Sequence, residues 1–150
     1  EASSALSTQV ILIVAASLAL GAAMMTTGGA EYIAQVFVAV SYGLPPGGVL
    51  ASLMLLLAIL TNIVSNNAAA VIGTPIAISV ASQLNLSPEP FILAVLFGAN
   101  LSYATPMAYK TNLLVMNAGG YQFSDFMRVG IPLILLMWVT LSFLLNWLYL

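Results

Sequence analysis

Apolar residues run through the chain in long segments, separated by short polar or glycine-containing stretches. The first segment, 10–27, is long enough at ~1.5 Å per residue to come close to crossing a hydrocarbon core of about 30 Å. It predicts a membrane-spanning helix that ends at a pair of glycines. In the next stretch Glu31 and Gln35 are spaced i, i+4, which predicts a short helix at the membrane interface over about 31–41.

The second segment, about 48–82, has two apolar halves on either side of the polar stretch TNIVSNN at 61–67. As one straight helix it would be roughly 50 Å long, well beyond the thickness of the hydrocarbon core. Each half alone is roughly 18 Å long and reaches only the bilayer midplane. The pattern therefore predicts a re-entrant helical hairpin with its tip at 61–67.

The third segment, about 91–117, is interrupted by GANLSYATPMAYKTN. Proline inside a helix removes one hydrogen bond and clashes with the preceding turn, so Pro106 predicts a discontinuous membrane helix. The second part of this helix is expected to begin at Thr105 and Pro106, or further on at Thr111 and Asn112.

The last segment, about 129–150, predicts a final span after an interfacial stretch in which Ser124 is the expected N-cap. The whole pattern predicts an all-α membrane protein with transmembrane helices, one re-entrant helical hairpin and one discontinuous helix. Composition agrees, since 62% of the residues are hydrophobic and 4% are charged. A soluble domain has roughly half apolar and a quarter charged residues.

The residue types that are missing exclude several kinds of chemistry. The chain has no cysteine and no histidine, so disulfides, thiolate or imidazole metal sites and Cys/His nucleophiles are excluded. Asp125 is the sole aspartate, which also excludes an aspartyl dyad. A Ser/Lys pair through Lys110 is the one nucleophilic arrangement that remains. The chain is therefore not expected to be an enzyme.

The few charges predict how the chain lies in the membrane. In the order span, hairpin, broken span and span, Lys110 and Arg128 fall on one side of the bilayer, and Glu31 and Glu89 fall on the other. Because basic residues favour the cytoplasmic side, the N-terminus of this segment and the turn at 118–130 are expected in the cytoplasm. The expected location is the plasma (inner) membrane.

Two interrupted helices in succession predict a binding cavity near the midplane. In a membrane, non-helical backbone is tolerated only where protein buries it or where it lines a wet cavity. The half-helix that starts near Asn67 directs N–H groups and the positive end of its dipole inward, which suits an anion, and the half that ends near Leu60 directs carbonyls inward, which suit Na⁺. Anion donors are available from Ser65, Asn66 and Asn67, and oxygen ligands for a cation from Thr61, Asn62 and Ser65.

A structural role for the same residues remains open. Ser, Thr and Asn side chains often cap turns and form hydrogen bonds between membrane helices, and the polar tip has the composition for that role too. Lys110 also has two interpretations. An ionisable residue inside a membrane is a candidate functional group, here one that stabilises a bound dianion. Alternatively, its long side chain extends to the cytoplasmic surface.

The residues around both interruptions resemble a known family. TNIVSNNAAAVIGTPIA and GANLSYATPMAYKTNLLVMNAGGYQFSDFMRVGIPL resemble the second half of the divalent anion/sodium symporters, the sodium:dicarboxylate and sodium:sulfate carriers with a citrate-transporter-like domain. The resemblance covers about 10–150. Family members consist of two inverted repeats and work as homodimers by an elevator-like movement. The resemblance thus implies that the chain is the C-terminal repeat of a larger permease and lacks the N-terminal repeat.

The resemblance also implies roles for individual residues. The implied substrate contacts are Ser65, Asn66, Asn67, Pro106 and Asn112, to which the charge argument adds Lys110. The implied Na⁺ ligands are Thr61, Ser65, Asn66, Ala104 and Thr105. Asn67 stands where the family signature has threonine, which bears on the preferred anion. The break is also longer than the Thr-Pro-Pro-Asn form of the dicarboxylate carriers and resembles the branch that includes sulfate-type permeases.

The leading hypothesis is Na⁺-coupled secondary transport of a small divalent anion, sulfate in preference to a C4-dicarboxylate. Na⁺ is the expected coupling ion and no other cofactor is expected. The expected partners are the anion, the lipid bilayer, the missing repeat and a second copy in a homodimer, with no nucleic acid. The alternatives are an ion exchanger or oxyanion/metalloid efflux permease of the same superfamily, or a non-transporting membrane scaffold subunit.

Overall fold

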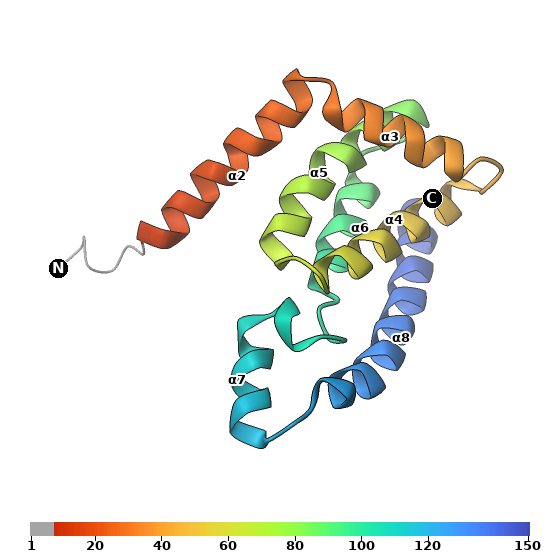
Figure 1. The fold of residues 1–150 in the computed structure, drawn as a ribbon. Helices are drawn as coiled ribbons and strands as arrows, with labels where there is room; N and C mark the ends of the chain where they lie inside the picture. The colour runs from red at the N-terminus through yellow and green to blue at the C-terminus, as the bar shows by residue number, and fades with distance from the viewer. Residues whose placement is uncertain (1–7) are drawn as a thin grey trace.

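The computed structural model describes residues 8–150, and this part of the chain is helical without any strand (Figure 1). Its helices are α2 (Thr8–Thr26), α3 (Gly29–Val40), α4 (Pro46–Thr61), α5 (Asn66–Gln83), α6 (Glu89–Asn100), η1 (Pro106–Ala108, a 3₁₀ helix), α7 (Lys110–Gly119) and α8 (Phe123–Tyr149). The prediction of an all-α chain is confirmed.

Helices α4, α5 and α6 form the centre of the fold, because α6 packs against both of the other two. Their shared core is apolar and fully buried, and its largest side chains include Leu50, Leu53, Met54, Val80, Phe91 and Val95. Close packing of α4 against α6 requires Gly98, where an added Cβ would lie 2.7 Å from the carbonyl oxygen of Met54. Since that atom belongs to the backbone, any side chain at Gly98 would force the two helices apart.

Helix α8 lies outside this centre and packs along α4 and α6. The indole Nε1 of Trp138 donates a hydrogen bond of 2.7 Å to the carbonyl of Ala51 in α4, which fixes the two helices together. In the described part of the chain, α8 is the one helix long and apolar enough to cross a membrane by length and composition, and its apolar window is 17% buried. Most of its side chains thus face outward, as in a lipid-exposed helix.

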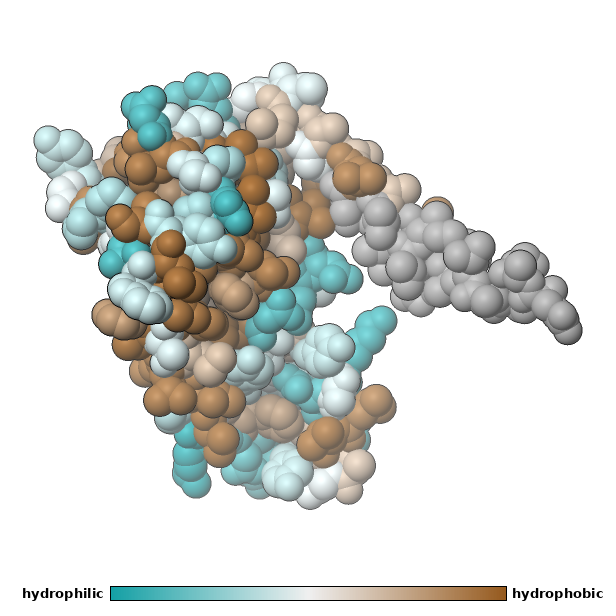
Figure 2. Space-filling view, turned by 180° about the vertical axis from the view of Figure 1, so that it is seen from behind, coloured by the Kyte–Doolittle hydropathy of each residue, from teal (hydrophilic) through white to brown (hydrophobic). Residues whose placement is uncertain are grey.

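The surface has the polarity of a protein that lies in a bilayer. Figure 2 shows hydrophobic residues over much of the middle of one face and hydrophilic residues at its upper and lower edges. Helix α3 and the start of α6 lie at one end of the molecule, whereas α7 and the start of α8 lie at the other (Figure 1).

The start of α8 differs from the sequence prediction. The helix begins at Phe123, before the predicted span of 129–150, and its N-cap is Gln122, so the prediction of Ser124 as the N-cap is wrong. The carboxylate Oδ2 of Asp125 accepts a hydrogen bond of 2.8 Å from the backbone N–H of Gln122, and the Gln122 side chain completes a capping box. A reciprocal pair that occupies two free backbone groups is favoured over a single hydroxyl cap.

Candidate functional site

The turn between α4 and α5 and the break after α6 lie at the same place in the fold. Helix α4 ends at Thr61, α5 begins at Asn66, and α6 ends at Asn100. Figure 1 shows these ends meeting near the middle of the molecule. Residues 101–105 then continue without helical structure before η1 begins. The structure thus brings together the two polar interruptions that the sequence placed about 40 residues apart.

Asn62 connects the two interruptions directly. Its side-chain Nδ2 donates to the carbonyl of Leu101 at 2.9 Å, and its Oδ1 accepts from the backbone N–H of Ala104 at 3.0 Å. Its own backbone carbonyl accepts a hydrogen bond of 2.8 Å from the hydroxyl of Thr105. A single turn residue therefore holds three residues of the break.

Thr61 and Asn66 form a second link, deeper in the fold. Thr61 is fully buried, and its Oγ1 lies 2.8 Å from the carbonyl oxygen of Ala99 and 2.8 Å from Oδ1 of Asn66. The Nδ2 of Asn66 donates to Oγ of Ser102 at 3.3 Å. A hydroxyl has one proton and can donate to one of its two neighbours at a time. The proton of Thr61 thus goes either to Asn66 or to Ala99, and when it goes to Ala99 the oxygens of Thr61 and Asn66 face each other as two acceptors.

The N-terminus of α5 offers donors to an anion. Ser65 is the N-cap, and its Oγ accepts a hydrogen bond of 3.3 Å from the backbone N–H of Ala68. Ser65 therefore has a structural role, while its own hydroxyl proton remains available. Among residues 8–150 no hydrogen bond uses the backbone N–H of Asn66 or Asn67. Ser65 and Asn67 are exposed, so these donors are accessible.

The far side of the break is held by Asn112. Its Nδ2 donates to the carbonyls of Ser102, at 2.9 Å, and Thr105, at 3.2 Å. Pro106 is fully buried and begins only the 3₁₀ turn η1, and the α-helix resumes at Lys110, which is exposed. Figure 2 shows hydrophilic residues along a notch in the outline at the height where α5 and α7 begin.

Five of the nine predicted site residues lie in this network, and Ser65, Asn67, Pro106 and Lys110 make no hydrogen bond to it. The residues joined by hydrogen bonds are Thr61, Asn66, Thr105, Ala104 and Asn112. Ser65 bonds within its own helix start. The carbonyl oxygen of Ala104 receives no hydrogen bond from the described residues, which leaves it open to an ion.

Sequence analysis missed the part of the site that α8 supplies. Gly130 of α8 is buried against the break, and a Cβ at this position would overlap the carbonyl of Tyr103 and lie 2.6 Å from Cα of Ala104. The backbone of the break thus rests directly on α8. The absence of a side chain at Gly130 is a signal visible in the sequence, but nothing local distinguishes this glycine from the others.

An open, mainly apolar pocket of about 340 Å³ lies between the break, α7 and α8. Asn112 and Asp125 contribute polar atoms to its wall, and the remaining lining residues are Tyr103, Val115, Tyr121, Phe126, Val129, Gly130 and Leu133. With so few polar groups, this open pocket suits an apolar occupant and does not suit a dianion.

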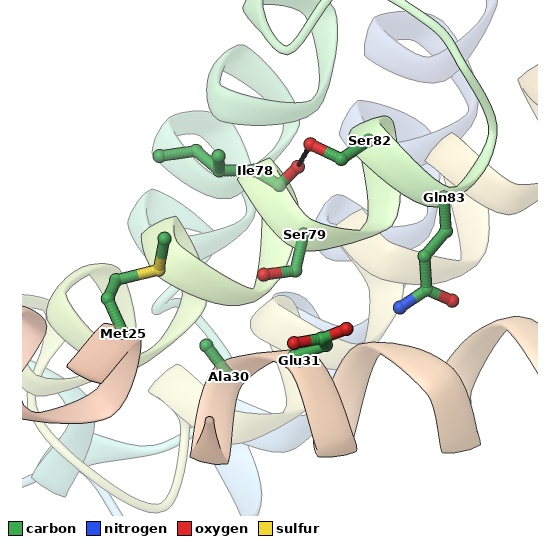
Figure 3. Close-up of a pocket in the computed structure, with 7 residues that line it drawn as sticks. All are labelled: Met25, Ala30, Glu31, Ile78, Ser79, Ser82 and Gln83. Atoms are coloured by element: carbon green, nitrogen blue, oxygen red, sulfur yellow. Dashed lines mark hydrogen bonds between the residues drawn. The ribbon is translucent and has the colours of Figure 1, made fainter. Parts of the chain in front are cut away.

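A second groove, of about 410 Å³, lies between α3 and the last turns of α5 (Figure 3). The carboxylate of Glu31 points toward Ser79 across the groove, with Ser82 and Gln83 beyond it (Figure 3). These residues lie near the end of α5 opposite to Asn66, so the groove is separate from the tip and the break. The negative charge of Glu31 makes this groove unsuitable for an anion.

Comparisons with known proteins agree with a transporter. A family model described as "Citrate transporter" matches residues 1–150. The protein named "Uncharacterized transporter sll0640" from Synechocystis sp. is 41% identical over 130 residues, covering 83% of this chain and 20% of that protein. "Sodium/sulfate cotransporter 1" from Chlamydomonas reinhardtii is 31% identical over 137 residues, covering 91% of this chain and 16% of that protein.

A further relative bears a different kind of name. "Putative transporter arsB" from Dictyostelium discoideum is 36% identical over 78 residues, covering 51% of this chain and 14% of that protein. The chain spans about a fifth of the length of the first of these relatives and less of the others.

Proposed function

The chain belongs to the citrate transporter family, whose members are integral membrane proteins, and from that premise we propose that it forms the C-terminal repeat of a Na⁺-coupled carrier of small divalent anions. The membership agrees with the resemblance of both polar interruptions to the divalent anion/sodium symporters. The observation that carries the proposal is the hydrogen-bonded junction of two helix interruptions. Among the described residues, one interruption has N–H donors without a partner, at Asn66 and Asn67, and the other has the unbonded carbonyl of Ala104. Junctions of broken helices bind substrate and coupling ion in secondary transporters.

The rest of the carrier is proposed from the length of the relatives. Because the chain spans about a fifth of the first relative, the complete permease has room for a second, inverted repeat and for further segments. In the complete permease, α4 and α5 are proposed to form a re-entrant hairpin, and two copies of the permease are proposed to form a homodimer. The complete permease is therefore the object of the transport experiments below. The proposed reaction is transport without chemical conversion, with Na⁺ as the coupling ion and no other cofactor.

The anion is proposed to bind at the N-terminus of α5. The free N–H groups of Asn66 and Asn67 and the hydroxyl of Ser65 are donors there, and the positive end of the helix dipole adds to their attraction. The resemblance adds Pro106 and Asn112 from the break. Both amide protons of Asn112 go to the carbonyls of Ser102 and Thr105, so Asn112 contributes by holding the backbone of the break in place. Neutral donors suit a substrate that must also be released.

Na⁺ is proposed to bind beside the anion, on oxygen atoms from both interruptions. Thr105 directs its hydroxyl proton to the carbonyl of Asn62, so the lone pairs of its Oγ1 stay free for a cation. When Thr61 donates to Ala99, its Oγ1 and the Oδ1 of Asn66 are two acceptors 2.8 Å apart, and a cation between them relieves their repulsion. The carbonyl of Ala104, and Ser65 at the tip, complete the proposed ligand set.

Sulfate is the proposed substrate in preference to a C4-dicarboxylate. The relatives whose names state a substrate include sodium/sulfate cotransporters, and the break of this chain is of the longer form. The second candidate is efflux of an oxyanion or metalloid, which the relative named after arsB supports. A scaffold without transport is the remaining alternative, and it predicts that changes at the tip alter stability without altering any ligand affinity.

The test is uptake of labelled sulfate into proteoliposomes that contain the complete permease. An inward Na⁺ gradient is expected to drive accumulation, and unlabelled sulfate is expected to compete better than succinate. Accumulation that follows a proton gradient and ignores Na⁺ would refute the coupling ion. Preferential competition by arsenite or arsenate would favour the efflux permease.

Lys110→Gln is expected to raise the apparent KM for sulfate about tenfold, because a charge-assisted interaction with a dianion is worth roughly 1.5–3 kcal/mol. Lys110 begins α7 beside the break, where its charge and the positive end of the helix act on the same place. Arg128→Gln is the matched control, since Arg128 is equally exposed but lies within α8. An unchanged KM would mean that Lys110 only extends to the membrane surface.

The proposed orientation places the loops around α7 and the start of α8 in the cytoplasm. Lys110 belongs to α7 and Arg128 to the first turns of α8, the two elements at this end of the molecule, while Glu31 and Glu89 belong to the starts of α3 and α6 at the other end (Figure 1). This separation supports a cytoplasmic position for the N-terminal residues of the segment. The proposed location is the plasma membrane.

A further inference from the structure

We propose that Asn62 is a positioning residue that joins the hairpin turn to the break, so that the Na⁺ ligands and the anion donors are assembled together. The inference builds on the proposed function and adds a residue that touches neither the ion nor the anion. It also changes the expectation from sequence, in which the side chain of Asn62 was a candidate oxygen ligand.

Both donors of the Asn62 side chain are already in use, and its oxygen accepts one hydrogen bond. One amide proton goes to the carbonyl of Ala58, at 2.7 Å, and the other to the carbonyl of Leu101, at 2.9 Å. Its Oδ1 accepts from the N–H of Ala104 at 3.0 Å. A primary amide has two donors and one acceptor oxygen, so no donor remains for an anion.

The two carbonyls that share this amide belong to the C-terminal ends of different helices. Ala58 lies in the last turn of α4, and Leu101 is the C-cap of α6. Carbonyls at helix ends have no partner within their own helix. Asn62 therefore satisfies an end of α4 and an end of α6 with one side chain, and this fixes where the break begins relative to the hairpin.

On the hairpin side, the other side-chain bond to the break is the one from Nδ2 of Asn66 to Oγ of Ser102, at 3.3 Å. The residues of the break are not helical, so their positions depend on contacts from other elements. Asn62 holds Leu101, Ala104 and Thr105, whereas Asn112 holds the opposite side. The bond to Thr105 uses the backbone carbonyl of Asn62 and remains in any variant. Loss of the side-chain bonds to Leu101 and Ala104 would still let the ligands at 104–105 shift relative to those at 61 and 66, while each ligand itself would remain.

Asn62→Asp is the most selective variant. The carboxylate has nearly the same shape and keeps an acceptor for the N–H of Ala104, but it has no donor and places negative charge against two carbonyls. Asn100→Asp is the matched control. The Nδ2 of Asn100 bonds only to the carbonyl of Leu96 in its own helix, at 2.7 Å, and Asn100 is exposed.

The experiment measures initial sulfate uptake by the complete permease over a grid of Na⁺ and sulfate concentrations. Asn62→Asp is expected to raise the half-saturating concentrations of Na⁺ and of sulfate about tenfold. Both sites depend on the connection that Asn62 makes between the turn and the break, so they lose affinity together. Uptake at saturating concentrations of both ions is expected to change by only a few fold, and Asn100→Asp is expected to match the wild type. Normal half-saturation with lower maximal uptake, in proportion to the amount of folded permease, would mean that Asn62 is only structural.

Amide hydrogen exchange separates this inference from the proposed function. In Asn62→Asp the peptide that contains 101–109 is expected to exchange about tenfold faster than in Asn100→Asp, whatever the coupling ion is. Equal exchange in the two variants would refute the inference that Asn62 holds the break against the hairpin turn. Wild-type uptake without Na⁺ dependence, together with faster exchange in Asn62→Asp, would refute Na⁺ coupling and would still support the positioning role of Asn62.

Discussion

Gly130→Ala is expected to destabilise the permease by about 1–3 kcal/mol and to abolish sulfate uptake, because the new methyl group has no space. It would overlap the carbonyl of Tyr103 and approach Cα of Ala104, and both of these belong to backbone. Backbone cannot swing aside as the end of a side chain can, so either α8 or the break must move. A displaced break separates Ala104 and Thr105 from the tip. Sulfate uptake is therefore expected to be lost even at temperatures where the variant is still folded. The measurements are the apparent melting temperature and sulfate uptake.

Two other glycines give graded controls for Gly130. A Cβ added at Gly21 in α2 would have no atom within 4 Å, so Gly21→Ala is expected to be neutral or to stabilise the helix by up to about 1 kcal/mol. At Gly73 the nearest atom would be Cδ1 of Leu57, at 2.7 Å, which is the end of a flexible side chain, so an intermediate loss is expected. Wild-type uptake in Gly130→Ala would show that the break does not depend on contact with α8.

The features that could be predicted from sequence are those that depend on local spacing. The polar stretch 61–67 divides an apolar segment into halves too short to span a bilayer, and the structure places the turn between α4 and α5 there. Pro106 likewise marks an interruption, and the α-helix resumes at Lys110, close to the later of the two predicted starts. Both features follow from the spacing of residues along the sequence, together with the rise of a helix, the thickness of a membrane and the steric effect of proline.

The features that could not be predicted depend on partners that are distant in sequence. Asn62 meets Leu101 and Ala104 across about 40 residues, and the contact between Gly130 and Tyr103 joins α8 to the break. Residue type alone does not say which carbonyl an amide will reach or which glycine will face a backbone. The N-cap of α8 failed for a related reason, since Ser124 satisfies the local rule but Gln122 and Asp125 satisfy it reciprocally.

Thr61→Val is expected to remove most of the Na⁺ dependence of sulfate uptake. Loss of a ligand together with a buried hydrogen bond is expected to raise the Na⁺ concentration for half-maximal uptake about 100-fold, which corresponds to roughly 2.7 kcal/mol of binding free energy. Valine keeps nearly the shape of threonine, so the fully buried site stays filled. The change deletes the hydroxyl that contacts both Ala99 and Asn66. Thr61→Ser, which retains a hydroxyl, is expected to restore most of the Na⁺ dependence.

The control for the loss of a buried hydroxyl is Thr74→Val in α5. The Oγ1 of Thr74 donates only to the carbonyl of Ala70 in its own helix, at 2.7 Å, and the residue is half-buried. A structural penalty alone would appear in both variants as a lower melting temperature with unchanged Na⁺ affinity. A loss of Na⁺ affinity confined to position 61 would instead assign Thr61 to the ion. If Thr61→Val kept normal Na⁺ affinity, Thr61 would not be a ligand of the ion, and its hydroxyl would serve only as a hydrogen-bond donor to Ala99 or Asn66.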